Sequence, residues 1–205
     1  KVKIGGYDLI KLDRLARDVC FKTREFSQKA FDDSFDNQLK EKLNEFNKKY
    51  FPNPEFKRNV WKGVIKDEKK YGEEKLKQFL DENKEFFEKN GTKNASELLN
   101  EKTMSGFLYK WFPKRERQEL FYYIKFLEKI EEEKLKNTLM IILSRTARSC
   151  RATKHSDLAT LTEPQIGPYY CPKHKKICTP INSIVKHLIR YTYDTIKRLN
   201  EFSTL

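Results

Sequence analysis

The residues SRTARSCRATKH (144–155), followed after a Pro/Gly loop by YYCPKHKKIC (169–178), form the most distinctive part of this sequence. They contain three of the four cysteines and two of the three histidines. The loop between them carries Pro164, Gly167 and Pro168, which interrupt any helix. On both sides of residues 152–180, apolar residues recur at the three- and four-residue spacing of amphipathic helices. We therefore predict a mainly α fold, with an irregular Cys/His module between the last two helices.

The helical pattern indicates six helices, over about residues 8–30, 39–50, 71–89, 113–131, 134–151 and 182–202. Residues 55–70 are basic and weakly patterned around Trp61. The aromatic run FLYKWFP (107–113) suits a core anchor better than a base-stacking platform. We expect a helical region over residues 1–112, with a short extended segment at its start. We expect a second helical module over residues 113–205, with the Cys/His loop at about 152–180.

The charge is unevenly distributed along the chain. The net charge is +13 in 205 residues, and residues 141–205 carry 11 Lys and Arg against 4 Asp and Glu. Such a surplus is typical of proteins that bind nucleic acid or a membrane surface. No apolar run approaches the length of a membrane span, and no signal-peptide pattern is present. We expect a protein of the reducing cytoplasm, because four unevenly spaced cysteines do not suggest a disulfide framework. Since the chain begins at Lys1 without a methionine, we expect a piece of a longer protein.

Three arginines indicate a surface that contacts DNA. On a helix, Arg145, Arg148 and Arg151 lie one turn apart, opposite the apolar side chains. No acidic residue occurs between Glu133 and Asp157, so no local carboxylate neutralises them. Arginine suits bidentate contacts with phosphate. The alternative is a solvated or internally salt-bridged face. The lysines expected to extend the DNA surface are Lys154, Lys173, Lys175 and Lys176.

The spacing C-x2-H-x3-C at Cys171, His174 and Cys178 is typical of metal ligands. Thiolate and imidazole suit a structural Zn²⁺, which takes four ligands tetrahedrally. The fourth is either His155 or Cys150. We favour His155, because it lies just past a helix end, whereas Cys150 would point into the apolar side of that helix. The alternative is a basic surface turn with incidental thiols. A bound zinc would stabilise a loop with little apolar content.

The sequence resembles a known family over two stretches, SRTARSCRATKHSDLAT (144–160) and PYYCPKHKKICTPINSIVKHLIRYTYDTIKRLNEF (168–202). They resemble the region between the cofactor-binding and catalytic halves of prokaryotic site-specific DNA methyltransferases. These enzymes use S-adenosylmethionine to methylate adenine N6 or cytosine N4. The start, VKIGGYDL (2–9), resembles the chain just after the first half. The family's Phe-x-Gly-x-Gly loop is absent, and no two prolines are adjacent. The resemblance therefore carries over no catalytic residue and no cofactor-binding residue.

These observations predict a DNA-binding, target-recognition insert of a methyltransferase that is not catalytic by itself. Its expected partners are duplex DNA and the remaining halves of a parent enzyme, with no membrane. S-adenosylmethionine would bind to the parent enzyme and not to this chain. The alternatives are a non-enzymatic helical interaction scaffold and an RNA-binding zinc module.

Overall fold

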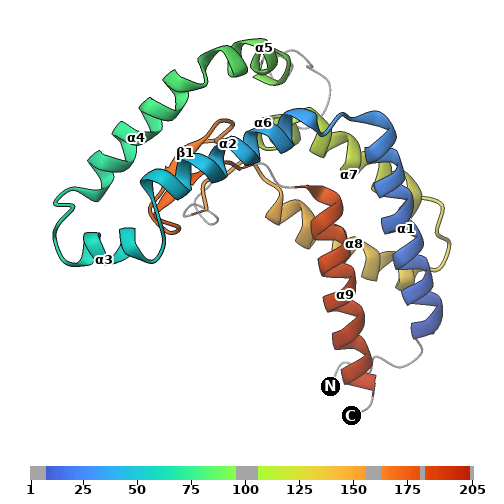
Figure 1. The fold of residues 1–205 in the computed structure, drawn as a ribbon. Coiled ribbons are helices and arrows are strands. Elements are labelled where there is room, and N and C mark those ends of the chain that lie inside the picture. Colours follow the sequence, from blue (N-terminus) through green and yellow to red (C-terminus); the bar gives the residue numbers. More distant parts are fainter. Residues whose placement is uncertain (1–7, 96–105, 156–162, 181–182, 204–205) are drawn as a thin grey trace. The chain divides into compact units, whose positions relative to one another are not determined.

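The computed structural model describes residues 8–95, 106–155, 163–180 and 183–203, and these are mainly helical, as predicted (Figure 1). The chain divides into two compact units. Unit 1 contains Lys1–Phe31, Lys114–Arg151 and Asn182–Leu205. Unit 2 contains Asp32–Pro113 and Ala152–Ile181. The arginines of the predicted DNA surface lie in unit 1, and the Cys/His module lies in unit 2. None of the described helices is long and apolar enough to cross a membrane.

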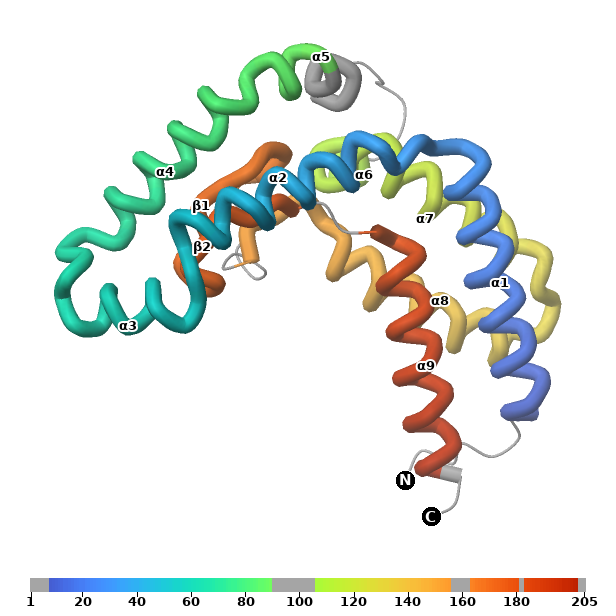
Figure 2. Tube along the Cα trace, viewed as in Figure 1, coloured from blue at the N-terminus to red at the C-terminus, as the bar shows by residue number. Residues whose placement is uncertain are grey.

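In its described residues, unit 1 consists of four long helices that pack against one another, α1 (Leu9–Ala30), α7 (Lys114–Leu127), α8 (Glu133–Ser149) and α9 (Ile184–Ser203). The Asp8 carboxylate begins α1 by accepting a hydrogen bond from the Lys11 backbone N–H at 2.9 Å. The first and last of these helices lie side by side (Figures 1 and 2). Their buried stripes follow the helical period, with Leu12, Ala16 and Val19 on α1 and Ile184, Leu188, Thr192 and Ile196 on α9.

Unit 2 consists of five helices and a two-stranded antiparallel sheet within the described residues. The helices are α2 (Ser34–Tyr50), α3 (Glu55–Trp61), α4 (Glu68–Glu82), α5 (Lys84–Ala95) and α6 (Gly106–Trp111), and the strands are β1 (Tyr169–Cys171) and β2 (Lys176–Cys178). Strand β1 packs against α4 and β2 packs against both α2 and α4. Leu43, Phe46 and Phe79 join Tyr170 and Ile177 of the hairpin in one buried core.

The structure differs from the predicted elements of unit 2 in three places. The helix expected over residues 71–89 is two helices. The first, α4, ends at Glu82 and is capped by Asn83, whose side-chain amide donates to the Phe79 carbonyl at 2.8 Å. The weakly patterned residues 55–70 contain the short helix α3. The irregular module contains a β-hairpin. Its strands are three residues long, too short for an alternation of apolar and polar residues to predict them. As expected for a core anchor, Trp111 and Phe112 are buried.

Candidate metal centre

The hairpin places three potential metal ligands on one side of the sheet. Tyr169 pairs with Cys178, Tyr170 with Ile177, and Cys171 with Lys176. Because side chains alternate along a strand, Cys171 and Cys178 share one face, while Tyr170 and Ile177 share the other. The second face is buried in the core of unit 2. The turn between the strands brings His174 back toward Cys178, and Lys175 in this turn has a positive φ of 55°.

His155 reaches the same place from a segment that follows α8. The phenolic oxygen of Tyr169 accepts a hydrogen bond from the His155 backbone N–H at 2.7 Å. The same oxygen lies 2.9 Å from His155 Nδ1. Upstream, the Ala152 N–H donates to the Trp111 carbonyl at 2.8 Å, which fixes this segment to α6. Tyr169 therefore holds His155 against the hairpin, a role that no local pattern in the sequence indicates.

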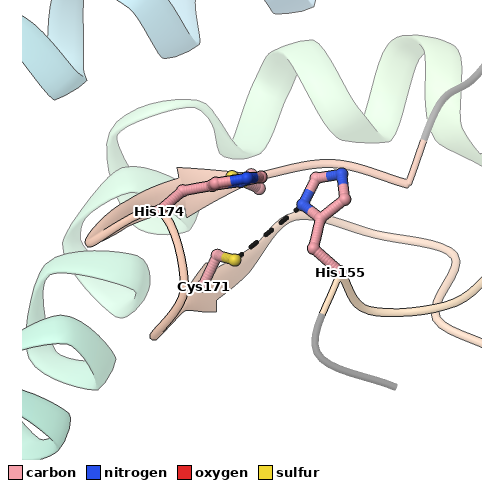
Figure 3. Close-up of side chains that lie close together, drawn as sticks. His155, Cys171 and His174 are labelled. Atoms are coloured by element: carbon pink, nitrogen blue, oxygen red, sulfur yellow. Dashed lines mark hydrogen bonds between the residues drawn. The ribbon is translucent and has the colours of Figure 1, made fainter. Parts of the chain in front are cut away.

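The ligand atoms of His155, Cys171, His174 and Cys178 all lie within 4.8 Å of one another. His155 Nδ1 lies 3.8 Å from Cys171 Sγ (Figure 3), and His174 Nδ1 lies 3.5 Å from Cys178 Sγ. Ligand atoms around a tetrahedral zinc are roughly 3.3–3.8 Å apart, given bond lengths of about 2.0–2.3 Å. The separation between His174 and Cys178 matches this geometry. His155 Nδ1 lies slightly farther from its thiol and also lies 2.9 Å from the Tyr169 oxygen, so this nitrogen would leave that oxygen on binding an ion. The set of two thiols and two imidazoles, partly shielded from solvent, suits Zn²⁺.

The surroundings of the group favour the uncharged forms of its ligands. Burial lowers the pKa of His155, and the nearby positive charges of His174 and Lys173 lower it further. Burial, followed by the charges of Lys173 and Lys176, likewise lowers the pKa of His174. Both imidazoles are therefore neutral at pH 7, as ligation requires. Burial and the neighbouring Cys171 raise the pKa of the Cys178 thiol. A metal ion that binds here would therefore have to displace the proton of the Cys178 thiol.

Cys150 has a different environment. It follows the last residue of α8 and is buried in unit 1, 2% exposed. Burial raises the pKa of its thiol, and the carboxylates of Glu116 and Glu119 raise it further. The group of four donor atoms found among the described residues contains His155 and does not contain Cys150.

Side chains of two helices of unit 2, α2 and α4, hold the hairpin in place. The buried Asn47 side chain on α2 donates to the Ile177 carbonyl and accepts from the Ile177 N–H, both at 2.9 Å. The Glu68 carboxylate in the first turn of α4 accepts a hydrogen bond from the Tyr170 hydroxyl at 2.7 Å and forms an ion pair with Lys175. Asn47 is 130 residues from its partner, so nothing local in the sequence indicates it.

The predicted DNA-contacting arginines differ in their surroundings. Arg145 pairs with Asp194 of α9 at 2.5 Å, donates to the Thr195 hydroxyl at 3.0 Å and lies 4.5 Å from the Tyr191 ring centroid. Arg145, followed by Arg198, holds the pKa of Asp194 below its usual value. Arg145 therefore matches the internally salt-bridged alternative, because a carboxylate on a helix that is distant in the sequence takes the place of a local one.

The remaining predicted cations are more accessible. Arg148 is exposed, and Arg151 is half-buried and donates from Nε to the Arg148 carbonyl at 3.2 Å. In unit 2, Lys154 and Lys173 are exposed and Lys176 is half-buried. Lys175 is the member of this set that Glu68 neutralises.

Comparison with known proteins confirms the predicted resemblance. The chain is 44% identical over all of its 205 residues to the type II methyltransferase M.MjaII of Methanocaldococcus jannaschii. It spans 38% of the length of that relative. No family model and no solved structure matches the chain.

Proposed function

We propose that this chain is the DNA-contacting, target-recognition region of a site-specific DNA methyltransferase. The observation that carries the proposal is the similarity of the whole chain to part of a type II methyltransferase. The positive net charge and the exposed cations of both units agree with a role in binding phosphate. In the parent enzyme, S-adenosylmethionine would be bound elsewhere, and the grip of this region on DNA would help other parts extrude the target base.

A structural Zn²⁺ at His155, Cys171, His174 and Cys178 is part of this proposal. The ion would join the segment before residue 156 to the hairpin and would fix the turn that carries Lys173 and Lys176. Four protein ligands leave no open position for a reacting water, so the role is structural. The convergence of the four donor atoms within 4.8 Å supports it.

The isolated chain is expected to bind duplex DNA in a salt-sensitive manner and to transfer no methyl group. Each phosphate contact releases counterions, so affinity falls steeply with salt. A labelled duplex measured by fluorescence anisotropy at several salt concentrations, together with an assay for methyl transfer from S-adenosylmethionine, checks both parts. Absence of binding at low salt would contradict the DNA role, and methyl transfer would contradict the non-catalytic role.

Replacing Arg148 and Arg151 together by alanine is expected to weaken duplex binding and to reduce the salt slope. The slope should fall by about one for each phosphate contact that is lost. The matched control is Arg14→Ala, which removes an exposed arginine from α1. Arg145→Ala should instead lower thermal stability, because it breaks the pair with Asp194. A double variant with unchanged affinity and unchanged slope would exclude these arginines as phosphate contacts.

A second candidate function is a helical scaffold that docks other parts of a methyltransferase. The observation that favours it is a groove of about 680 Å³ between α1 and α9 in unit 1. Exposed Phe21, Ile189 and Tyr193 line this groove. The scaffold function predicts no salt-dependent DNA binding by the isolated chain, whereas the proposed function requires it.

A further inference from the structure

Helix α3 of unit 2 carries an exposed tryptophan that the fold does not use. Trp61, the last residue of α3, is 88% exposed, while the other tryptophan of the chain, Trp111, is 3% exposed. Large aromatic side chains contribute most of their stabilisation when they are buried. An aromatic ring exposed to solvent at the end of a packed helix therefore points to a role in binding a partner and not in stabilising the fold.

The packing of α3 depends on other residues. Phe56 is buried, and its ring centroid lies 5.0 Å from that of Phe51 and 5.6 Å from that of Tyr71. Val60 and Ile65 pack against the same core. Gly63, with φ +71°, ends the helix, and the Val64 N–H donates back to the Asn59 carbonyl at 3.0 Å. The turn that presents Trp61 is thus fixed without any contribution from its indole.

The surroundings of Trp61 are strongly basic. Residues 56–66 contain four cations and no acid, and all four cations are exposed: Lys57, Arg58, Lys62 and Lys66. Within the described part of the chain, none of these four forms an ion pair. Because residues three and four apart share a helix face, Lys57 and Arg58 lie on the side of α3 that carries Trp61.

This basic surface belongs to the same unit as the Cys/His hairpin. The Phe51 ring, which contacts Phe56 of α3, also stacks on Tyr170 of β1 at a centroid distance of 5.7 Å. The cations of α3 and the lysines of the hairpin turn, Lys173 and Lys176, therefore lie on parts of unit 2 that the core connects.

We propose that α3 is a DNA-contacting element in which Trp61 packs against bases or sugars of a duplex while Lys57, Arg58 and Lys62 bind the flanking phosphates. The inference rests on the proposed DNA-binding function and adds a surface to it. Charge complementarity selects the partner, because a run of cations without acids fits a polyanion. An indole among such cations adds the apolar and stacking contact that phosphate binding lacks.

The test compares Trp61→Ala with Trp61→Phe and with Tyr193→Ala, a control in unit 1 that removes an aromatic side chain that is 68% exposed. Trp61→Ala should weaken duplex binding about five- to 100-fold, as expected for a lost stacking contact, without changing the salt slope. Trp61→Phe should retain most of the affinity. A Lys57→Gln/Lys62→Gln variant should instead lower the slope by about two. The thermal stability of all variants should stay close to that of the native chain, since these side chains are exposed.

Intrinsic fluorescence gives a second measurement on the native chain. Trp111 is buried, so quenching of the emission by acrylamide reports mainly on Trp61. Saturating duplex should protect this emission, and the effect should disappear in Trp61→Phe.

Native-like affinity of Trp61→Ala, or an equally accessible Trp61 in the complex, would overturn this inference while leaving the proposed function intact. Failure of the native chain to bind duplex at low salt would overturn both. The variants should also be tested with an RNA hairpin and with anionic phosphatidylserine vesicles. If Trp61 matters for binding one of these and not for binding duplex DNA, the surface belongs to RNA or to membranes and the inference is overturned.

Discussion

Replacing Cys171 or Cys178 by serine is expected to abolish zinc binding and to destabilise unit 2. The loss of a thiolate ligand should cost more than the roughly 10–100-fold loss of affinity that removing an outer-shell partner causes. Metal analysis of the purified chain should give one zinc per native molecule and none for the variants. In the native chain, Co²⁺ in place of zinc should give the absorption of a thiolate-bound tetrahedral ion, and the serine variants should lack it.

The controls for this prediction also decide the fourth ligand. Cys20→Ser changes a buried thiol of unit 1 whose Sγ lies 3.2 Å from the Thr192 hydroxyl, and it should leave the metal content unchanged. Cys150→Ser should also retain zinc, whereas His155→Asn should lose affinity. A native chain that is folded and free of metal would exclude the zinc site. Retention of zinc by Cys171→Ser would exclude this ligand set.

Replacing Gly72 by alanine is expected to destabilise unit 2 by about 2 kcal/mol. A methyl group at this position of α4 would lie 2.4 Å from Cγ of the Tyr170 ring, a buried side chain. Alanine gains about 1 kcal/mol in helix propensity, but overpacking costs typically 1–3 kcal/mol and here falls at the upper end or above. The melting temperature of unit 2 should fall by roughly 5–10 °C. Because Tyr170 precedes Cys171, the displaced ring should also weaken zinc binding.

The matched control is Gly106→Ala, in the first residue of α6. A methyl group there meets nothing within 4 Å, so the melting temperature should remain within a few degrees of the native value. Equal melting temperatures for the native chain and Gly72→Ala would show that displacing the Tyr170 ring costs only the roughly 1 kcal/mol that alanine gains in helix propensity. Such a result would contradict a rigid hairpin.

The sequence predicts the long helices well because each buries a continuous stripe, as Leu12, Ala16 and Val19 do on α1. It also singles out Cys171, His174 and Cys178, because their spacing is local. The sequence does not predict contacts between side chains that lie far apart along the chain. Asp194 neutralises Arg145, and Asn47 and Glu68 hold the hairpin, although none of them is near its partner in the sequence.

The hairpin also changes the expected contribution of zinc. The sequence suggested a loop with little apolar content that a metal must hold. The structure instead buries Tyr170 and Ile177 in the core of unit 2. Zinc contributes roughly 10–16 kcal/mol in peptides that cannot fold without it. Here the strands have other contacts, so the ion's main effect would fall on the segment that carries His155.

The segments of the two units alternate along the chain, and this order has a consequence for biosynthesis. Helix α1 packs most extensively on α9, and the core of unit 2 includes the hairpin that begins at Tyr169. Neither core can therefore close while the ribosome is still making the first two-thirds of the chain. The apolar stripe of α1 emerges before the other helices of unit 1 and receives its main partner last, a long-range closure that slows folding. Nascent chains stalled before residue 169 should thus be degraded by protease throughout, and resistance should appear in unit 2 before it appears in unit 1.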